Sequence, residues 1–101
     1  MIAWDRISGF DWDGSNAAKK STDKHDVSQG EAEQVFFNEP LLIAVDVKHS
    51  TAEPHIHALG HTDDGRLLHI TFTLRTGETK IRVISARDIS RREKRYYEQE
   101  S

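Results

Sequence analysis

Histidine, threonine and arginine side chains alternate with apolar ones along three neighbouring stretches of this sequence. The polar positions include His55 and His57 in the first stretch, Thr71 and Thr73 in the second, and Arg82 in the third. Because alternate side chains of a β-strand point to one face, each stretch presents its polar residues together. Histidine can accept or donate a proton near neutral pH, and arginine holds two phosphate oxygens in one planar fork. The set is therefore typical of a site that acts on a phosphodiester.

Cleavage of RNA without a metal would require three things of such a site. A base must take the proton of the 2′-hydroxyl, cations must stabilise the charge that builds up on the phosphoryl group, and an acid must protonate the leaving 5′-oxygen. We predict that His55, Arg75 and Arg82 fill these catalytic roles, with the assignment of acid and base left open. The residues that we expect to bind RNA around them are His57, Thr73, Lys80, Arg87, Arg91, Arg92 and Tyr97.

Two other interpretations fit the same pattern. An antiparallel sheet with one solvated face shows polar alternation without any activity, so the chain could be a catalytically silent module that binds RNA or a protein partner. His55, His57 and His61 could also ligate a metal ion, because residues two apart on a strand point the same way. Leu59 interrupts that row, however, and the sequence has no cysteine, whereas structural zinc sites have a closed set of ligands. We therefore expect no metal and no other cofactor.

Short β-strands and three helices are expected to position these residues. Ser28 with Glu31, and Ser90 with Glu93, have the spacing of a capping box, which opens a helix. A more polar helix is expected before them, over residues 15–25. The alternating pattern predicts strands over residues 8–12, 41–47, 55–61, 67–75 and 80–86. The predicted fold class is α+β, with two N-terminal helices and a C-terminal helix on the apolar face of a curved antiparallel sheet.

Two turns define the register of the predicted sheet. A three-residue loop, Asp63-Asp64-Gly65, keeps polar residues opposite polar ones and pairs position 61 with 67, 57 with 71, and 55 with 73. A two-residue loop, Gly77-Glu78, pairs 75 with 80 and 73 with 82, and glycine at its first position suits a type II′ turn. His55, Thr73 and Arg82 should therefore form one row across the polar face.

Composition predicts one domain of 101 residues with an uneven charge distribution. Residues 75–95 hold eight of the fourteen basic residues and only three of the seventeen acidic ones, a local balance of +5, while the rest of the chain carries −8. This segregation favours an anionic partner for the basic segment. The absence of cysteine, of a long apolar run and of a signal-peptide pattern leads us to expect a cytoplasmic protein without membrane contact.

An ordered series of motifs over about residues 10–98 resembles the BrnT family. The first are F-x-W-D at Phe10–Asp13 and K-H-x-V-S-x-x-E-A-x-x-V-F at Lys24–Phe36. A Leu-Gly pair at Leu59 and a Gly-Arg-Leu-Leu run from Gly65 follow. The later motifs are T-x-R at Thr73–Arg75, I-R-V-I-S-A-R at Ile81–Arg87 and R-R-E-x-R-x-Y at Arg91–Tyr97.

The resemblance implies a toxin of a type II toxin–antitoxin system, with a fold similar to RelE-type ribonucleases. Such a toxin would cleave RNA and inhibit translation. Its partner would be a BrnA-like antitoxin of ribbon-helix-helix type, so that the toxin would reach operator DNA only through the antitoxin. On the matching positions, the functional arginines of the family would be Arg75 and Arg82, with Arg87 close by. The chain departs from the pattern at His55, where the family is expected to carry an arginine.

Overall fold

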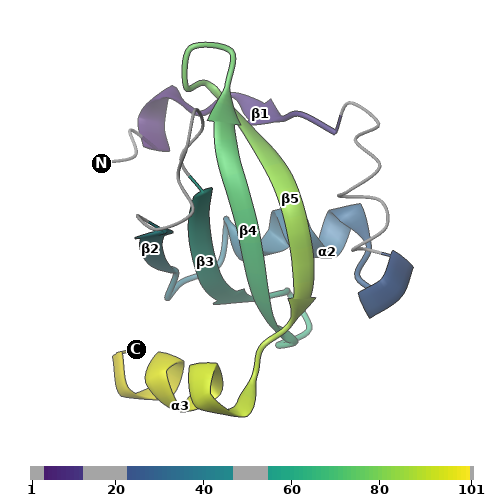
Figure 1. The fold of residues 1–101 in the computed structure, drawn as a ribbon, viewed down its shortest axis with the longest axis vertical. Helices are drawn as coiled ribbons and strands as arrows, with labels where there is room; N and C mark the ends of the chain where they lie inside the picture. The colour runs from purple at the N-terminus through teal and green to yellow at the C-terminus, as the bar shows by residue number, and fades with distance from the viewer. Residues whose placement is uncertain (1–3, 13–22, 47–54, 101) are drawn as a thin grey trace.

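The fold was obtained as a computed structural model, which describes residues 4–12, 23–46 and 55–100 (Figure 1). These residues form an α+β structure around one five-stranded open sheet, as the predicted fold class requires. The helices among them are η1 (Trp4–Arg6), a 3-10 helix that the sequence pattern did not reveal, and the α-helices α2 (Gln29–Val35) and α3 (Arg91–Glu100). Most of the helix predicted over residues 15–25 lies outside the described residues. Its last three positions, 23–25, are described, and they are helical.

The sheet has the strand order β1-β5-β4-β3-β2. The bounds of its strands are Gly9–Phe10 for β1, Leu42–Asp46 for β2, His55–His61 for β3, Leu67–Arg75 for β4 and Lys80–Asp88 for β5. Strands β2 to β5 pair in antiparallel order, but β1 runs parallel to β5, so the prediction of a wholly antiparallel sheet was wrong. No hairpin joins β1 to β5. The direction of β1 is therefore set by its docking against the edge strand β5 and not by a turn.

The predicted register of the central strands is confirmed, whereas one turn type is not. His61 faces Leu67, and Arg75 faces Lys80, as the loop lengths required. Gly65 has φ +85°, as the glycine of a three-residue hairpin loop should. At the second turn Thr76, Gly77 and Glu78 all have positive φ, +55°, +64° and +67°, whereas the predicted type II′ turn requires a positive φ at Gly77 alone.

One face of the sheet forms the apolar core with α2. Ser28 and Glu31 make the predicted capping box at its start, and Ala32 and Val35 are fully buried against the sheet. Gly60 lies beneath this helix, where a Cβ would come within 2.7 Å of Val35 Cγ1. The helix therefore sits on the sheet at a distance that only glycine at position 60 permits.

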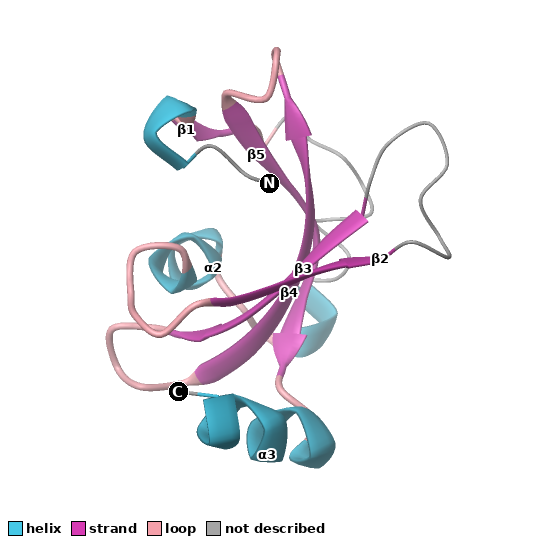
Figure 2. Ribbon diagram, turned by 90° about the vertical axis from the view of Figure 1, so that its left-hand side faces the viewer, coloured by secondary structure: helices cyan, strands magenta, loops and turns pink. Residues whose placement is uncertain are grey.

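Helix α3 does not share that apolar face, contrary to the prediction. Figure 2 shows α2 on one side of the curved sheet and α3 across its lower end. Tyr97 is buried there, and its hydroxyl donates to the carbonyl oxygen of Pro40 at 2.5 Å. The first turn of α3 reaches the opposite, polar face, where Glu93 contacts His69. The physical reason is the chain path: β5 ends at Asp88, and Ser90 caps the helix two residues later.

Arg66 ties the β3–β4 turn to the helical layer. Its Nε and Nη2 donate to both carboxylate oxygens of Asp88, at 2.8 and 3.1 Å. Its Nη1 donates to the carbonyl oxygen of Asp26 and to Glu31 Oε2, at 2.8 and 3.2 Å. The Arg66 side chain thus joins Asp88 at the end of β5, the loop at Asp26 that precedes α2, and the capping glutamate of α2. Among the described residues, no helix is long and apolar enough to cross a membrane.

Candidate functional site

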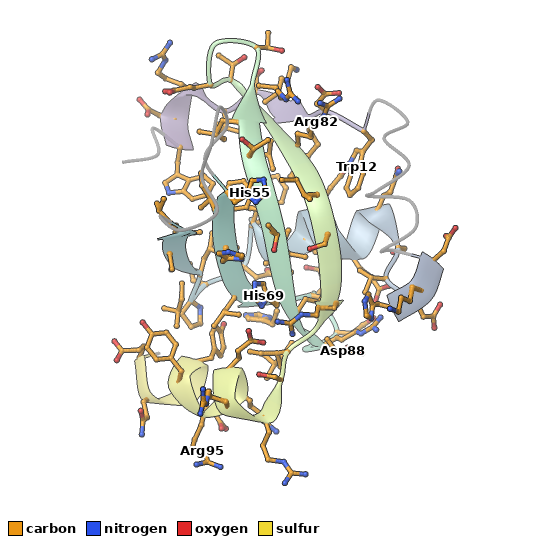
Figure 3. All side chains as sticks on the ribbon, in the orientation of Figure 1. Trp12, His55, His69, Arg82, Asp88 and Arg95 are labelled. Carbon is orange, nitrogen blue, oxygen red and sulfur yellow. The ribbon has the colours of Figure 1, made fainter. Side chains whose placement is uncertain are left out.

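The face of the sheet opposite α2 carries the predicted site residues from β3, β4 and β5. Thr73 faces Arg82, and Arg75 faces Lys80, in the predicted register. The β3–β4 ladder ends at Ile56 and Phe72, one step before the predicted pairing of positions 55 and 73. Figure 3 shows His55 near the middle of this face, with Arg82 above it and His69 below. We refer to this surface, with the polar residues of β3, β4 and β5, as the polar face.

The upper part of the polar face is cationic. The side chain of Arg82 is 19% exposed, and its Nε lies 4.0 Å from Asp11 Oδ2. Arg75 and Lys80 are half-buried beside it at the end of the hairpin. Thr73, by contrast, is 1% exposed, and its hydroxyl oxygen has no hydrogen-bond partner among the described residues. Its burial argues against the predicted contact of Thr73 with RNA and leaves the arginines to form that surface.

Two histidines meet at the centre of the polar face. His57 on β3 and His69 on β4 pack edge-to-face, with ring centroids 5.0 Å apart. The Nδ1 of His57 lies 2.9 Å from Nε2 of His69 and 3.1 Å from Thr71 Oγ1. The register places His57 opposite Thr71 and leaves His69 on the diagonal, within reach of an aromatic side chain.

Glu93 holds the other side of His69. Its Oε2 lies 2.7 Å from His69 Nδ1, and Arg87 donates to its two carboxylate oxygens at 2.9 and 3.0 Å. Burial would raise the pKa of Glu93, but hydrogen bonds from Arg87 and from the Ser90 amide, together with His69, lower that pKa to about 2. Glu93 is therefore a carboxylate at any pH at which RNA is stable, and it can only accept hydrogen bonds.

We assign the protons of His69 from these contacts. Arg87 Nη2, which donates to Oε2 of Glu93, is also 2.7 Å from His69 Nδ1 and cannot accept a hydrogen bond, so Glu93 is the acceptor that faces Nδ1. The short contact between Nδ1 and a carboxylate requires a proton on Nδ1. Burial lowers the pKa of His69, and although Glu93 opposes this effect, the net shift is downward. A lowered pKa favours the neutral form of His69 near pH 7, and we assign its proton to Nδ1, which leaves Nε2 as an acceptor.

The remaining predicted RNA-binding residues divide between the sheet and α3. Arg87 belongs to the Glu93 cluster, and its side chain is 37% exposed. Arg91 and Arg92 are exposed on α3, and Arg95 of the same helix points away from the sheet (Figure 3). Tyr97 is buried and bonded to Pro40, which argues against its predicted contact with RNA, whereas Tyr96 is exposed.

His69 and Glu93 were not among the predicted site residues. Strand parity placed His69 on the polar side of β4, and the predicted pairing of 57 with 71 already left it diagonal to His57, so the signal for this contact was present in the register. Glu93 was assigned to the capping box, a role that it does fill, since Ser90 N donates to Oε1 and Glu93 N donates to Ser90 Oγ. A capping glutamate is expected to face the end of its own helix. The contact between Glu93 and His69 becomes apparent only from the position of α3 on the sheet.

The alternative of a metal site finds no support in the geometry. In the part of the chain that the structure describes, no group of three histidine, aspartate or glutamate side chains could hold a metal ion. His61 points both ring nitrogens at carbonyl oxygens, Nδ1 at Thr62 and Nε2 at Glu39, at 2.9 and 3.0 Å. Both hydrogen bonds raise the pKa of His61, and the bond to Glu39 has the larger effect. They favour the imidazolium form, which cannot ligate a metal ion.

An apolar cleft of about 1070 Å³ opens on the other face, beside the core. Its wall runs from η1 and β1 past the end of α2 to β2. The large side chains exposed there include Phe37, which is 77% exposed, and Trp4. Phe37 contacts the ring of Phe10 edge-on but leaves most of its surface in solvent. This cleft and the polar face lie on opposite sides of the sheet.

Comparison with known proteins agrees with this arrangement of motifs. No curated protein matches the sequence significantly. The family model described as "Ribonuclease toxin, BrnT, of type II toxin-antitoxin system" matches residues 12–93, which include all of α2, the four long strands and the first turn of α3. Because the match covers most of the chain, the protein belongs to the BrnT family of ribonuclease toxins.

Proposed function

We propose that the polar face is an RNA-cleaving site that works without a metal, and that cleavage inhibits translation. The observation that carries this proposal is the placement of imidazoles beside arginines on one open sheet surface. His55 and His57 stand two residues apart on β3, and Arg82 and Arg75 come from the adjoining hairpin. Family membership supports the reaction class, since the family is described as ribonuclease toxins.

The chemistry follows from the charges of these groups. Arg82 and Arg75 hold the phosphate and stabilise the charge that builds up on its oxygens, as preorganised cations do in other phosphoryl-transfer sites. One histidine removes the 2′-hydroxyl proton, and the 2′-oxygen attacks the phosphorus. Another histidine protonates the 5′-oxygen as the bond from phosphorus to that oxygen breaks. The products are a 2′,3′-cyclic phosphate and a 5′-hydroxyl. We assign His55 to this pair of proton-transferring histidines. The family is expected to carry an arginine at this position.

The partner of this toxin is proposed to be a DNA-binding antitoxin of ribbon-helix-helix type, seated in the apolar cleft. A type II toxin requires a protein antitoxin, and exposed apolar clefts are typical of protein interfaces. The cleft also has an exposed acidic side chain in its wall, Glu39, and Asp5 of the adjoining η1 is exposed as well. Their charge complements a basic DNA-binding protein. Operator DNA would then be reached through the antitoxin and RNA through the polar face.

The cleavage proposal is tested with purified toxin, free of antitoxin, incubated with RNA in EDTA. Wild type is compared with Arg82→Ala, His55→Ala and a control, Arg6→Ala, whose side chain is exposed on η1 away from the polar face. We expect cleavage by wild type and Arg6→Ala in chelator, and a loss of about 10²–10⁴ in rate for the two site variants. Intact RNA in every sample would instead indicate a module that binds without cutting, and cleavage that needs added zinc would overturn metal independence.

The antitoxin proposal is tested with Phe37→Asp. We expect this variant to cleave RNA normally but to bind the antitoxin at least tenfold more weakly, measured by calorimetry, because a carboxylate would be placed in an apolar contact. Arg95→Ala, whose side chain is exposed on α3 outside the cleft, serves as the surface control. Unchanged antitoxin affinity for Phe37→Asp would place the interface elsewhere.

A further inference from the structure

We infer that His57 is the general base of the cleavage reaction and that Glu93 and His69 are positioning residues that fix its tautomer through a chain of hydrogen bonds. The inference rests on the proposed function of the polar face. It adds two residues to the site, one of them from α3, and it divides the proton-transfer roles between the histidines of β3.

The chain of hydrogen bonds runs in one direction. Glu93 accepts the Nδ1 proton of His69 at 2.7 Å, which leaves His69 Nε2 without a proton. That nitrogen lies 2.9 Å from His57 Nδ1 and can only accept, so His57 must donate from Nδ1. Neutral His57 then has no proton on Nε2. A histidine with this tautomer can take the 2′-hydroxyl proton, and His55 is left to supply the proton of the 5′-oxygen.

Several of the described groups around His57 contribute to this arrangement. From β4, His69 accepts its proton and Thr71 Oγ1 lies 3.1 Å from the same nitrogen. From α3, the Glu93 carboxylate stabilises the imidazolium that forms when His57 takes a proton. From β5, Arg87 opposes that effect with its charge but holds both oxygens of Glu93 in place. His55 on β3 and Arg82 on β5 occupy the same face toward its upper end (Figure 3).

The second capping box of the chain shows that Glu93 does more than cap a helix. Glu31 also accepts from its serine's backbone amide and also binds an arginine, Arg66. It has no contact with a histidine among the described residues. Capping and arginine binding therefore do not require a histidine partner, and the contact between Glu93 and His69 is an addition. Glu31→Gln is consequently a matched control for Glu93→Gln.

The test measures kcat/KM for RNA cleavage as a function of pH. We expect His57→Ala to lose about 10²–10⁴ in rate, as removal of a general base does, and Glu93→Gln and His69→Gln to lose about 10–100-fold. In Glu93→Gln the acidic limb of the profile should also move to lower pH, because the charge that favours the protonated base is gone. Glu31→Gln and Ser90→Ala should unfold more easily but keep the wild-type profile.

A second measurement does not depend on activity. Nitrogen NMR of the ring of His57 in wild type should show a proton on Nδ1 near neutral pH, and Glu93→Gln should populate the other tautomer. A proton on Nε2 of wild-type His57, or an unchanged pH profile in Glu93→Gln, would overturn the inference. Wild type that fails to cleave RNA would contradict the proposed function, whereas cleavage that survives in His57→Ala would contradict this inference alone.

Discussion

Arg66 and Arg87 play similar roles near the same end of the sheet, since Arg66 binds Asp88, the residue that follows Arg87 in β5. Each is held by the glutamate of a capping box, and each anchors the start of a helix to the sheet. They differ in what else they touch, since Arg66 binds Asp88 and backbone carbonyls while Arg87 lies against His69. At the scale of single residues, one arginine therefore serves the fold and the other also belongs to the polar face.

Replacement of Arg66 by alanine should lower the free energy of unfolding by about 1–2 kcal/mol, because it removes several hydrogen bonds at once, although the carboxylates of Asp88 and Glu31 remain hydrated. Urea denaturation followed by circular dichroism measures this. Arg92→Ala, on the exposed side of α3, should change the value by less than about 0.5 kcal/mol. A similarly small change in Arg66→Ala would show that the contacts around Arg66 are not a stabilising network.

His61 should make stability depend on pH. Its folded-state pKa is raised by the carbonyl oxygens of Glu39 and Thr62, so its contribution is fully present below the unfolded pKa of about 6.5 and is lost as pH rises through the folded pKa. Thermal unfolding of wild type and His61→Ala at pH 5.5 and pH 9 should show a larger difference in Tm at the lower pH. An equal difference in Tm at both pH values would mean that protonation of His61 does not strengthen its hydrogen bonds to Glu39 and Thr62.

At the scale of elements, the contact between α2 and the sheet depends on the absence of one side chain. Gly60 is buried, and Val35 Cγ1 and Leu41 Cδ1 lie 2.7 and 3.4 Å from where its Cβ would be. The Val35 contact is below any normal van der Waals distance, so α2 would have to move away from β3. The helix, the glycine and the strand are thus one packing unit.

Gly60→Ala should therefore cost about 1–3 kcal/mol of stability, as overpacking of a core does. Combining it with Val35→Ala should cost less than the sum of the two single changes, because Val35→Ala makes room for the new methyl group. The control is Gly65→Ala, which meets nothing within 4 Å but has φ +85°. Its cost of about 1–2 kcal/mol should be additive with that of Val35→Ala. Additive costs for Gly60→Ala would contradict the packing argument.

At the scale of the whole molecule, the basic segment over residues 75–95 is divided between two surfaces. Arg75, Lys80 and Arg82 lie on the polar face, whereas Arg91 and Arg92 lie on α3 across the end of the sheet. The sequence presents these residues as one basic patch. Their separation by the fold predicts different roles, catalysis for Arg75 and Arg82 with Lys80 binding RNA beside them, and RNA binding alone for the residues of α3.

Arg82→Ala should stop cleavage, while the double variant Arg91→Ala/Arg92→Ala should mainly weaken RNA binding. Each lost phosphate contact should reduce the slope of log K against log salt by nearly 1, or about 0.7 for a single strand. Filter binding at several salt concentrations measures the slope, and single-turnover assays at saturating protein measure the chemistry. If both variants lost the same property, the two surfaces would not be functionally distinct.

The sequence by itself determined the strands, their register and the identity of the polar face. These features are local or depend on alternation and loop length, so Gly65, the Arg75–Lys80 pair and the two capping boxes could all be derived from spacing. The motifs also sufficed to indicate the family, which the match over residues 12–93 then established. The residues expected to act on RNA were named from the same parity argument.

Contacts between segments far apart in the chain could not be predicted from residue spacing and depend on the tertiary packing. The parallel docking of β1 and the position of α3 arise from packing between segments far apart in the chain, and no local spacing encodes them. That packing buries Thr73 and Tyr97, which parity and composition had presented as available to RNA. It also brings Glu93 to His69, because a helix cap and a strand meet only when both are placed in space, whereas the contact of His69 with His57 follows from the register of β3 and β4.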